Sequence, residues 1–536
     1  MNSQDTADVD IGQLSTPSEN ERQRPPWPVP TSQYFPTSTV AGMLLIFLLS
    51  TVFTMTSMHR LNHTDLWGHL SFGRLIIDQQ MLPATDPFAS GEPAARFVNI
   101  PWLAQATGFL VERAMGIEGL VLVHASLVTL CCGLLILAVY RQNVSLGWAI
   151  VAGAAAFVIG LPSAGVIRPQ LCGIALLPLV LMGCSALGSR RHPFAWMPIL
   201  FVLWANLHGS FAIGLLVMGV CTLAVIWDSI AQHRSFKRVL RDPHVNAFGL
   251  ATIACTIATC FNPLGPRILV VVASFAGHPA LQNITEWQPL VLKSLGGLLF
   301  FSSMIITAVV LRLSPRRFTS RDVLLLIVFA ALALSSMRML AWWAIIWPWV
   351  VVPHAMAAWG KHLAPQRDEI SVPNTMRTLF AMAMVFTCAL VAPPTYSLVS
   401  GQSRGVGRIS GAGTPLYVAD EITRRQLAGN LFCPMDWGDY LIWTSAGYLK
   451  PLVYTHVHLI RNDRWQDYQH ISAGGQDWLK LVDARQLDYM LLSRKRNASL
   501  ARLVQAEDRA RILYQDQQCL LVKLLPADEP SPAADS

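Results

Sequence analysis

Residues 59–102, HRLNHTDLWGHLSFGRLIIDQQMLPATDPFASGEPAARFVNIPW, decide how the rest of the chain is organised. The stretch follows the first long apolar run directly, and it carries seven acidic and histidine residues, more than the other connections between apolar runs. Apolar runs offer few groups for acid–base chemistry. We therefore expect any reaction of this protein to depend on these residues.

Within this stretch, Asp65 and His69 stand four positions apart in residues 65–80, whose apolar side chains have helical spacing. Side chains at this separation lie on the same face of a helix, here one lying along a membrane surface. Asp86 follows in Thr-Asp-Pro-Phe, where Pro87 disfavours helical geometry for its predecessor and favours a turn. We interpret Asp65, His69 and Asp86 as candidate catalytic residues.

Each of these residues also has a structural interpretation. Asp65 is a good helix cap, and Asp86 is typical of a turn residue. His63, Asp65 and His69 combine imidazole and carboxylate ligands that could hold Mg²⁺ or Mn²⁺. They could equally form a hydrogen-bonded cluster at the membrane surface, and the sequence leaves these alternatives open.

The composition identifies a polytopic membrane protein. Hydrophobic residues make up 53% of the chain and charged residues only 13%, whereas a soluble protein has about 25% charged residues. The formal net charge is +8, but Lys and Arg occur in short clusters between apolar runs, which indicates membrane orientation rather than a nucleic-acid partner.

Eleven apolar runs fit helices that cross about 30 Å of hydrocarbon. The predicted spans are residues 40–57, 117–140, 146–162, 170–188, 195–207, 209–230, 246–262, 295–313, 322–336, 339–358 and 376–393. The two spans between 195 and 230 form a hairpin, because only a hairpin places the basic clusters on both sides of it in the cytoplasm. The same rule puts the amino terminus in the cytoplasm, and Asp65, Asp86 and Glu286 outside.

Four regions follow from this division. Residues 1–38 are expected to be a disordered cytoplasmic tail, and 39–394 a transmembrane domain with a first outer loop at 58–116. Residues 395–525 are expected to form a small extracytoplasmic α/β domain, followed by a disordered tail at 526–536. The predicted strands are 452–457, 489–492, 511–514 and 519–524, and the predicted helices are 437–446, 463–471, 476–485 and 498–506.

Eight of the ten cysteines lie inside apolar runs, where thiols behave as small hydrophobic groups. Cys433 and Cys519 are the two that fall in the outer region. Because an oxidising compartment favours disulfides, we predict a bridge between them. The alternative is that both thiols are buried and free.

Several motifs resemble bacterial multi-span glycosyltransferases of the GT-C superfamily. In the first outer loop they are Asp65-Leu66-Trp67, His69, Gly73, Pro83, Asp86-Pro87-Phe88 and Trp102-Leu103. Further along, in the order seen in uncharacterised membrane proteins similar to this group, they are Arg168-Pro169-Gln170, Trp204-Ala205-Asn206-Leu207-His208-Gly209-Ser210, Asn262-Pro263-Leu264-Gly265, Glu286-Trp287-Gln288-Pro289, Asp436-Trp437-Gly438 and Tyr440-Leu441-Ile442-Trp443.

This resemblance implies transfer of a sugar from a polyprenyl-phosphate donor to a glycan, lipid or protein acceptor. The reaction would take place at the outer face of the bacterial inner membrane, with an essential acid early in the first outer loop. Asp65 matches that acid. The sequence lacks the two adjacent acids that some branches of the superfamily carry in this loop.

Arg168 and Arg338 fall at predicted outer ends of spans, where a lipid phosphate would lie. The planar guanidinium suits such a group, although either side chain could simply extend to the membrane interface. The other candidate substrate-binding residues are His208 at the hairpin tip, Glu286 and Trp102. His208 could instead be a satisfied interior histidine, and Glu286 a loop residue paired with Lys293.

Two other functions remain open. A lipid-linked glycan polymerase or ligase would share the membrane face and the donor type, and would differ in its acceptor. A secondary transporter would show inverted repeats with broken spans at matching positions, but only one broken hairpin appears in this chain.

Overall fold

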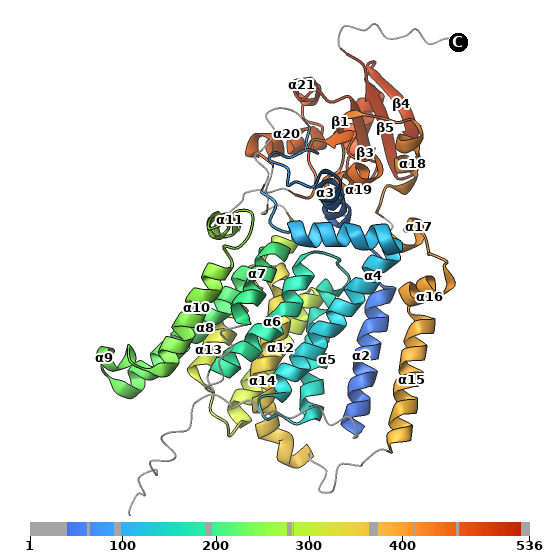
Figure 1. The fold of residues 1–536 in the computed structure, drawn as a ribbon. Coiled ribbons are helices and arrows are strands. Elements are labelled where there is room, and N and C mark those ends of the chain that lie inside the picture. Colours follow the sequence, from blue (N-terminus) through green and yellow to red (C-terminus); the bar gives the residue numbers. More distant parts are fainter. Residues whose placement is uncertain are drawn as a thin grey trace, which may run out of the picture.

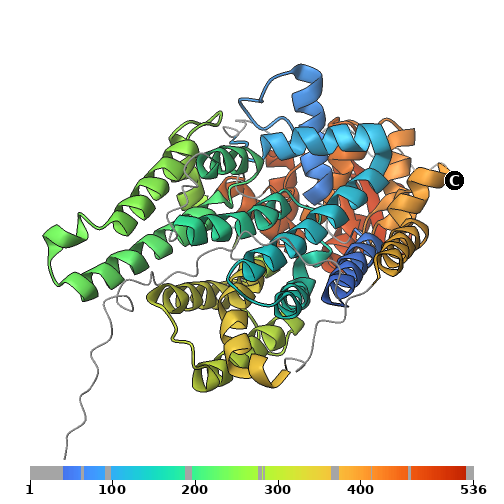
Figure 2. The same ribbon diagram turned by 60° about the horizontal axis from the view of Figure 1, so that its bottom comes forward.

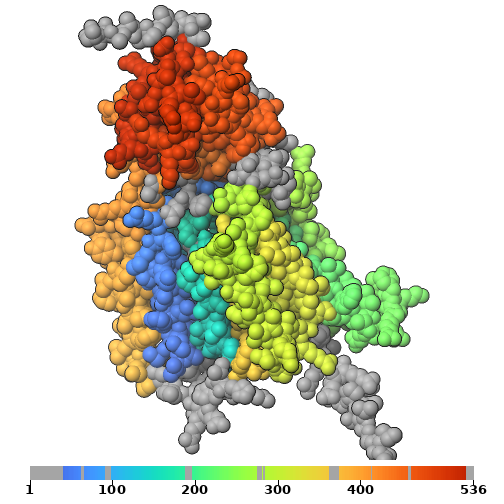
Figure 3. Space-filling model, turned by 180° about the vertical axis from the view of Figure 1, so that it is seen from behind, coloured from blue at the N-terminus to red at the C-terminus, as the bar shows by residue number. Residues whose placement is uncertain are grey.

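The computed structural model describes residues 40–61, 65–90, 98–187, 196–275, 281, 284–363, 373–411, 413–456 and 460–526. The two predicted tails lie outside these residues, apart from Pro526 at the start of the second. A bundle of long helices carries a smaller domain with a sheet on one of its ends (Figure 1). Seen from behind, this outer domain rests directly on the bundle (Figure 3).

A helix occupies each of the eleven predicted span positions. These are α2 (Val40–Met58), α4 (Trp102–Tyr140), α5 (Leu146–Ala164), α6 (Gln170–Leu187), α7 (Met197–Leu207), α8 (Phe211–His233), α10 (Pro243–Ala258), α12 (Leu295–Leu313), α13 (Ser320–Ser335), α14 (Leu340–Leu363) and α15 (Asn374–Val391). In the described part of the chain, eight helices are long and apolar enough to cross a membrane, while α7 and α10 are apolar but shorter. The polytopic helical architecture is confirmed. Figure 2 shows α2 beside α15 at one edge of the bundle, away from α8 and α10.

Helix α4 begins well before its predicted span. Gly116 interrupts it with φ of 65°, a conformation that costs glycine little because it has no Cβ. The first part of α4 therefore lies across the end of the bundle, and the second part descends through it (Figure 1). Part of the expected loop is thus a helix beneath the outer domain.

The outer domain is a mixed α/β domain, as predicted. Its sheet has the order β2-β1-β3-β5-β4, with β1 parallel to β2 and β3, and antiparallel pairing among β3, β5 and β4. The strands are β1 (Gly429–Phe432), β2 (Leu449–Pro451), β3 (Tyr489–Ser493), β4 (Ala510–Gln515) and β5 (Cys519–Leu524). Helix α16 (Pro393–Ser400) follows α15 and contacts α4 and α2 of the bundle. The helices of the outer domain are α17 (Val406–Ile409), α18 (Leu416–Arg424), α19 (Met435–Thr444), α20 (Asn462–Ala473), α21 (Trp478–Ala484) and α22 (Ala498–Gln505).

Two predictions about strands are wrong. No strand forms at 452–456, where one was expected. Strand β2 lies just before, at Leu449–Pro451, and the described residues after it are irregular. Strand β1 is missing from the prediction. Its four residues include a glycine and an asparagine, which are unfavourable in strands, and pairing with two neighbours stabilises it instead.

The predicted disulfide is also absent. Cys433 and Cys519 are both buried free thiols. Cys433 follows β1 and Cys519 opens β5, so that β3 lies between their strands. Two strand spacings amount to roughly 10 Å, beyond the approximately 7 Å that a disulfide allows between α-carbons.

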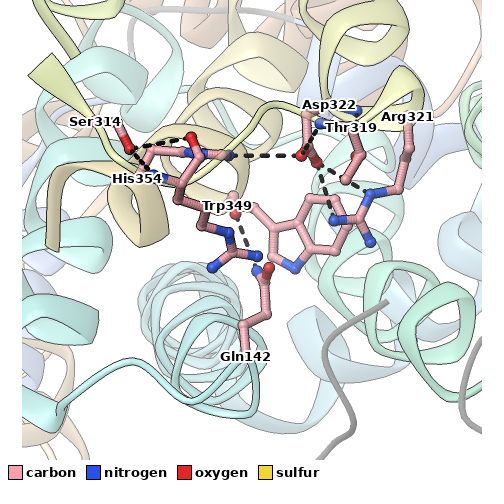
Figure 4. Close-up of polar contacts among 8 residues, drawn as sticks. Gln142, Ser314, Thr319, Arg321, Asp322, Trp349 and His354 are labelled. Carbon is pink, nitrogen blue, oxygen red and sulfur yellow. Dashed lines mark hydrogen bonds and ion pairs between the residues drawn. The ribbon is translucent and has the colours of Figure 1, made fainter. Parts of the chain in front are cut away.

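A buried polar cluster joins helices of the bundle (Figure 4). Arg321 donates to the Asp322 carboxylate at 2.9 Å, and the His354 ring nitrogen lies 3.5 Å from the same carboxylate. The Arg321 guanidinium also lies over the ring of Trp349, whose carbonyl accepts from Gln142 at 3.0 Å. The cluster therefore ties α13 to α14 and to the turn after α4.

Candidate functional site

Helix α3 (Asp65–Gln79), the predicted surface helix, lies between the bundle and the outer domain. Trp67 packs edge-on against Tyr440 of α19 with 5.2 Å between ring centroids, and Arg74 lies 3.7 Å from the ring centroid of Trp443. Gly68 allows the close approach, because a Cβ at this position would lie 1.9 Å from the Asp439 carboxylate. The outer domain thus covers the helix that carries the candidate acid.

Three charged residues from distant parts of the sequence meet at the first turn of α3. Arg168, in the α5–α6 connection, donates to the Asp65 carboxylate at 2.8 Å. It also donates to the carboxylate of Glu286, which lies in the 3₁₀ helix η3 (Thr285–Trp287). The three side chains are 13–21% exposed, so that they are largely buried yet accessible. Glu286, for which the sequence left open a role at the site or a pairing with Lys293, thus forms an ion pair with Arg168.

Arg338 completes this charged cluster from the 3₁₀ helix η4 (Met337–Met339). Its Nη1 lies 3.9 Å from the Glu286 carboxylate, and its Nε donates to the Gln170 side-chain oxygen at 2.8 Å. The Trp287 ring lies 5.3 Å from its guanidinium carbon. We refer to Asp65, Arg168, Glu286 and Arg338 as the charged cluster. It contains two carboxylates and two guanidinium groups.

His69 is half-buried next to the charged cluster. Its Nδ1 lies 3.2 Å from the Gln105 side-chain nitrogen, and the Gln105 oxygen accepts from Asn99 at 2.6 Å. Because an amide nitrogen only donates, Nδ1 is the acceptor and the proton of the neutral ring lies on Nε2. Loss of contact with water is the main cause, and nearby His456 the second, that holds the pKa of His69 well below its usual value. The ring is therefore neutral at pH 7.

His208 lies at the tip of the α7–α8 hairpin. Its Nδ1 accepts from the Ser210 backbone N–H at 3.0 Å. Burial, together with Arg338 and Arg168, lowers the pKa of His208 to about 3. His208 is therefore a neutral, hydrogen-bonded ring beside both arginines of the charged cluster.

Trp102 supports the hairpin from the start of α4. Its indole N–H donates to the Asn206 side-chain oxygen at 2.8 Å, and the Asn206 nitrogen donates to the carbonyls of Val202 and Phe261. These contacts hold α4, α7 and the segment after α10 together near the charged cluster. Trp102 is thus anchored by protein contacts.

Asp86 lies in a turn, as its sequence context predicts. One carboxylate oxygen accepts from the backbone N–H groups of Phe88 and Ala89 at 3.0 and 3.3 Å, and the other accepts from the Tyr454 hydroxyl at 2.8 Å. Only 4% of the residue is exposed. With both oxygens engaged, Asp86 joins the first outer loop to the outer domain.

The proposed metal ligands do not converge in the described part of the chain. His63 lies outside the described residues, and no group of three His, Cys, Asp or Glu side chains there is arranged to hold a metal ion. Arg168 holds the Asp65 carboxylate, and His69 uses Nδ1 to accept from Gln105. The Asp65 carboxylate and His69 Nδ1 are thus each engaged by another side chain in this structure.

Two residues of the outer domain near α3 were not predicted from the sequence. Asp439 is fully buried, and His456 lies against His69 with 4.9 Å between ring centroids. Asp439 stands in MDWGDYLIWT, and the helical pattern there does not distinguish it from the exposed Asp436 of the same helix. His456 carries no signal either, because it lies in an irregular segment.

An apolar cavity of about 80 Å³ opens among α4, α5, α6 and α14. Its lining includes Ser163 and Leu171, which flank the connection that carries Arg168, and Ala341, close in sequence to Arg338. The remaining lining residues are apolar. The cavity therefore reaches the membrane end at which both arginines lie.

No protein-family model and no curated protein sequence matches this chain. Among solved structures, AglB, an oligosaccharyltransferase from Archaeoglobus fulgidus, superposes with a TM-score of 0.57 at 11% identity, over 91% of this chain and 74% of AglB. The arabinofuranosyltransferase AftD from Mycobacteria gives a TM-score of 0.55 at 14% identity, over 90% of this chain and 41% of AftD. The fold is that of the GT-C glycosyltransferases.

This chain is also similar to a third structure, apo ArnT from Cupriavidus metallidurans. The TM-score is 0.50 at 14% identity, over 90% of this chain and 97% of ArnT. The GT-C architecture expected from the sequence motifs is thereby confirmed for nearly the whole chain. In this GT-C fold the charged cluster lies where the helical bundle meets the outer domain.

Proposed function

We propose that this protein is a glycosyltransferase that uses a polyprenyl-phosphate-linked sugar on the outer face of the bacterial inner membrane. The observation that carries the proposal is the meeting of Asp65, Arg168 and Glu286 beneath the outer domain, beside an apolar cavity. A lipid donor needs both an apolar path and a polar end. The GT-C fold supports a transferase over a transporter.

The lipid donor would bind with its phosphate at Arg168 and Arg338 and with part of its prenyl chain in the apolar cavity. Guanidinium groups bind phosphate through paired hydrogen bonds. The apolar lining of the cavity suits a prenyl chain. AglB, which shares the fold, was solved with a dolichol-phosphate, a lipid of the same chemical class.

Asp65 would act as the general base. Its carboxylate takes the proton of an acceptor hydroxyl, the hydroxyl oxygen bonds to the anomeric carbon, and the carbon–oxygen bond to phosphate breaks. The electron pair leaves with polyprenyl phosphate, whose negative charge the arginines stabilise. Phosphate binding at Arg168 would compete with the Asp65 ion pair, which leaves the carboxylate freer to accept the proton.

The acceptor would be a glycan, a lipid or a protein. A polymerase or ligase of lipid-linked glycans would use the same base and phosphate site with a different acceptor. Mass spectrometry of lipid-linked and surface glycans from a deletion strain would identify the missing product. The identity of that product distinguishes these acceptor classes.

A direct assay of transfer tests the proposal. Membranes containing the protein should incorporate radiolabelled sugar from polyprenyl-phosphate sugars into a product that membranes lacking it do not make. Asp65→Asn membranes serve as the matched control. Absence of transfer from a panel of donors, together with uptake of a solute by proteoliposomes, would instead support the transporter alternative.

We expect Arg338→Ala to weaken donor use more than Arg168→Ala. Arg168 is engaged by two carboxylates, whereas Arg338 bonds the neutral Gln170 and lies farther from Glu286. More of its charge is therefore available to a phosphate. Loss of a charged hydrogen bond, about 1.5–3 kcal/mol, corresponds to roughly a 10- to 100-fold rise in apparent donor KM.

Initial rates measured against donor concentration would check this order. Arg113→Ala, which removes an exposed arginine from α4, is the control and should leave the KM unchanged. An unchanged donor KM in both Arg338→Ala and Arg168→Ala would contradict the phosphate role.

We also expect the amino terminus in the cytoplasm and the outer domain outside. This orientation rests on the distribution of basic residues between the apolar runs. A reporter that is active only in the cytoplasm, fused after Leu525, should give no signal, whereas the same reporter fused at the amino terminus should be active. The opposite pattern would remove Asp65 from the outer face.

A further inference from the structure

We propose that the outer domain supplies positioning residues to the reaction centre, in the form of the buried pair Asp439 and His456. The inference rests on the proposed function and extends it from the bundle to the outer domain. The pair would hold His69 and the first turn of α3, and thereby keep Asp65 aligned with Arg168.

Asp439 is a carboxylate with no contact with water, because none of the residue is exposed. One oxygen accepts from the Thr455 backbone N–H at 3.0 Å, and the other lies 3.7 Å from Nδ1 of His456. A buried carboxylate is costly unless it is paired. Burial raises the pKa of Asp439, while His456 opposes that rise.

The pair faces α3 and not the interior of its own domain. A Cβ at Gly68 would lie 1.9 Å from the Asp439 oxygen and 3.2 Å from the His456 ring carbon Cε1. Glycine at this position therefore lets the outer domain place a charged pair against the helix that carries Asp65.

His69 is held from two sides as a consequence. The His456 ring packs edge-on against it from the outer domain, and Gln105 donates to its Nδ1 from α4. The charged and titratable groups that act on His69 are His456, Asp65, His208 and Arg168. Fixing this ring fixes the turn of α3 between His69 and Asp65.

Phe72 and Tyr454 enclose the other faces of the His456 ring, with centroids 5.0 and 5.5 Å away. Tyr454 in turn donates to Asp86 of the first outer loop. The ring is thus held by both the loop and the outer domain, as a positioning element requires.

Asp439→Asn tests the proposal, with Asp436→Asn as the matched control. Both acids lie on α19, but Asp436 is 42% exposed and pairs with Arg496 at the surface. We expect Asp439→Asn to lower kcat by about 10- to 100-fold while the donor KM changes less than about twofold, the pattern of a lost transition-state alignment. Asp436→Asn should match the wild type in both.

Gly68→Ala and His456→Asn perturb the same contact from either side. Each should reduce kcat without affecting the donor KM. The double variant Gly68→Ala/Asp439→Asn should reduce kcat by a smaller factor than the product of the two separate reductions. Equal kcat for wild type, Asp439→Asn and His456→Asn would overturn the inference while leaving transfer itself established.

A measurement without turnover separates the inference from the proposed function. In full-length protein labelled with ¹⁵N-histidine and reconstituted in lipid, the His69 resonances are assigned by their loss in His69→Gln. They should shift in Asp439→Asn and His456→Asn and stay in place in Asp436→Asn. Unshifted His69 resonances in the first two variants would refute the contact, even if wild-type protein transferred no sugar.

Discussion

Asp65→Asn is expected to lower the rate of sugar transfer by about 10²- to 10⁴-fold, the usual loss when a general base is removed. Asparagine keeps the size of the side chain and its oxygen can still accept from Arg168, so that the first turn of α3 should remain in place. The substitution removes only the ability to take a proton. Transfer by purified protein, measured alongside its unfolding temperature, separates loss of chemistry from loss of fold.

Asp78→Asn is a suitable control, because Asp78 is an exposed acid on the same helix. It should retain wild-type transfer. Asp86→Asn should mainly weaken the contact between the first loop and Tyr454, since both Asp86 oxygens are engaged there. Activity retained in Asp65→Asn but lost in a well-folded Asp86→Asn would reverse their roles, and activity retained in both would exclude the first outer loop as the source of the base.

The largest effect on stability is expected for Arg321→Ala. This substitution leaves the buried Asp322 carboxylate without its guanidinium and removes the packing on Trp349. Removing one partner of a buried ion pair lowers the free energy of unfolding by about 3–5 kcal/mol. The variant should therefore lose its native fold at a markedly lower temperature in detergent.

Arg317→Ala provides the comparison, because Arg317 is an exposed arginine in the connection just before α13, four residues from Arg321. Thermal unfolding of purified protein, followed by the fluorescence of a thiol-reactive probe at the buried cysteines, would measure both variants. An unfolding temperature for Arg321→Ala equal to that of Arg317→Ala would show that the buried cluster does not stabilise the bundle.

The local pattern of the sequence is sufficient for the spans and for α3. Runs of apolar residues long enough for a bilayer predict a helix wherever they occur, and all eleven positions are helical. Helical spacing in residues 65–80 likewise predicted α3 almost to its ends. The short apolar runs between helical patterns located β3, β4 and β5 for the same reason, because such a run is a local property.

Charge patterning also anticipated which residues share a compartment. Asp65, Arg168, Glu286 and Arg338 were all placed at the outer membrane face, and the structure brings them into one cluster. That this face is the outer one stays a prediction from the basic clusters between spans. The pairing of Arg168 with both acids could not be predicted, because it depends on how three distant segments pack.

Only the tertiary structure decided the contacts between the bundle and the outer domain. The approach of Asp439 to Gly68, the His69–His456 contact and the bond from Tyr454 to Asp86 each join residues that are hundreds of positions apart or lie in irregular segments. The same holds for Cys433 and Cys519, which β3 keeps apart. Local periodicity determines where elements form, whereas the side chains that meet depend on long-range packing, which no single segment of the sequence encodes.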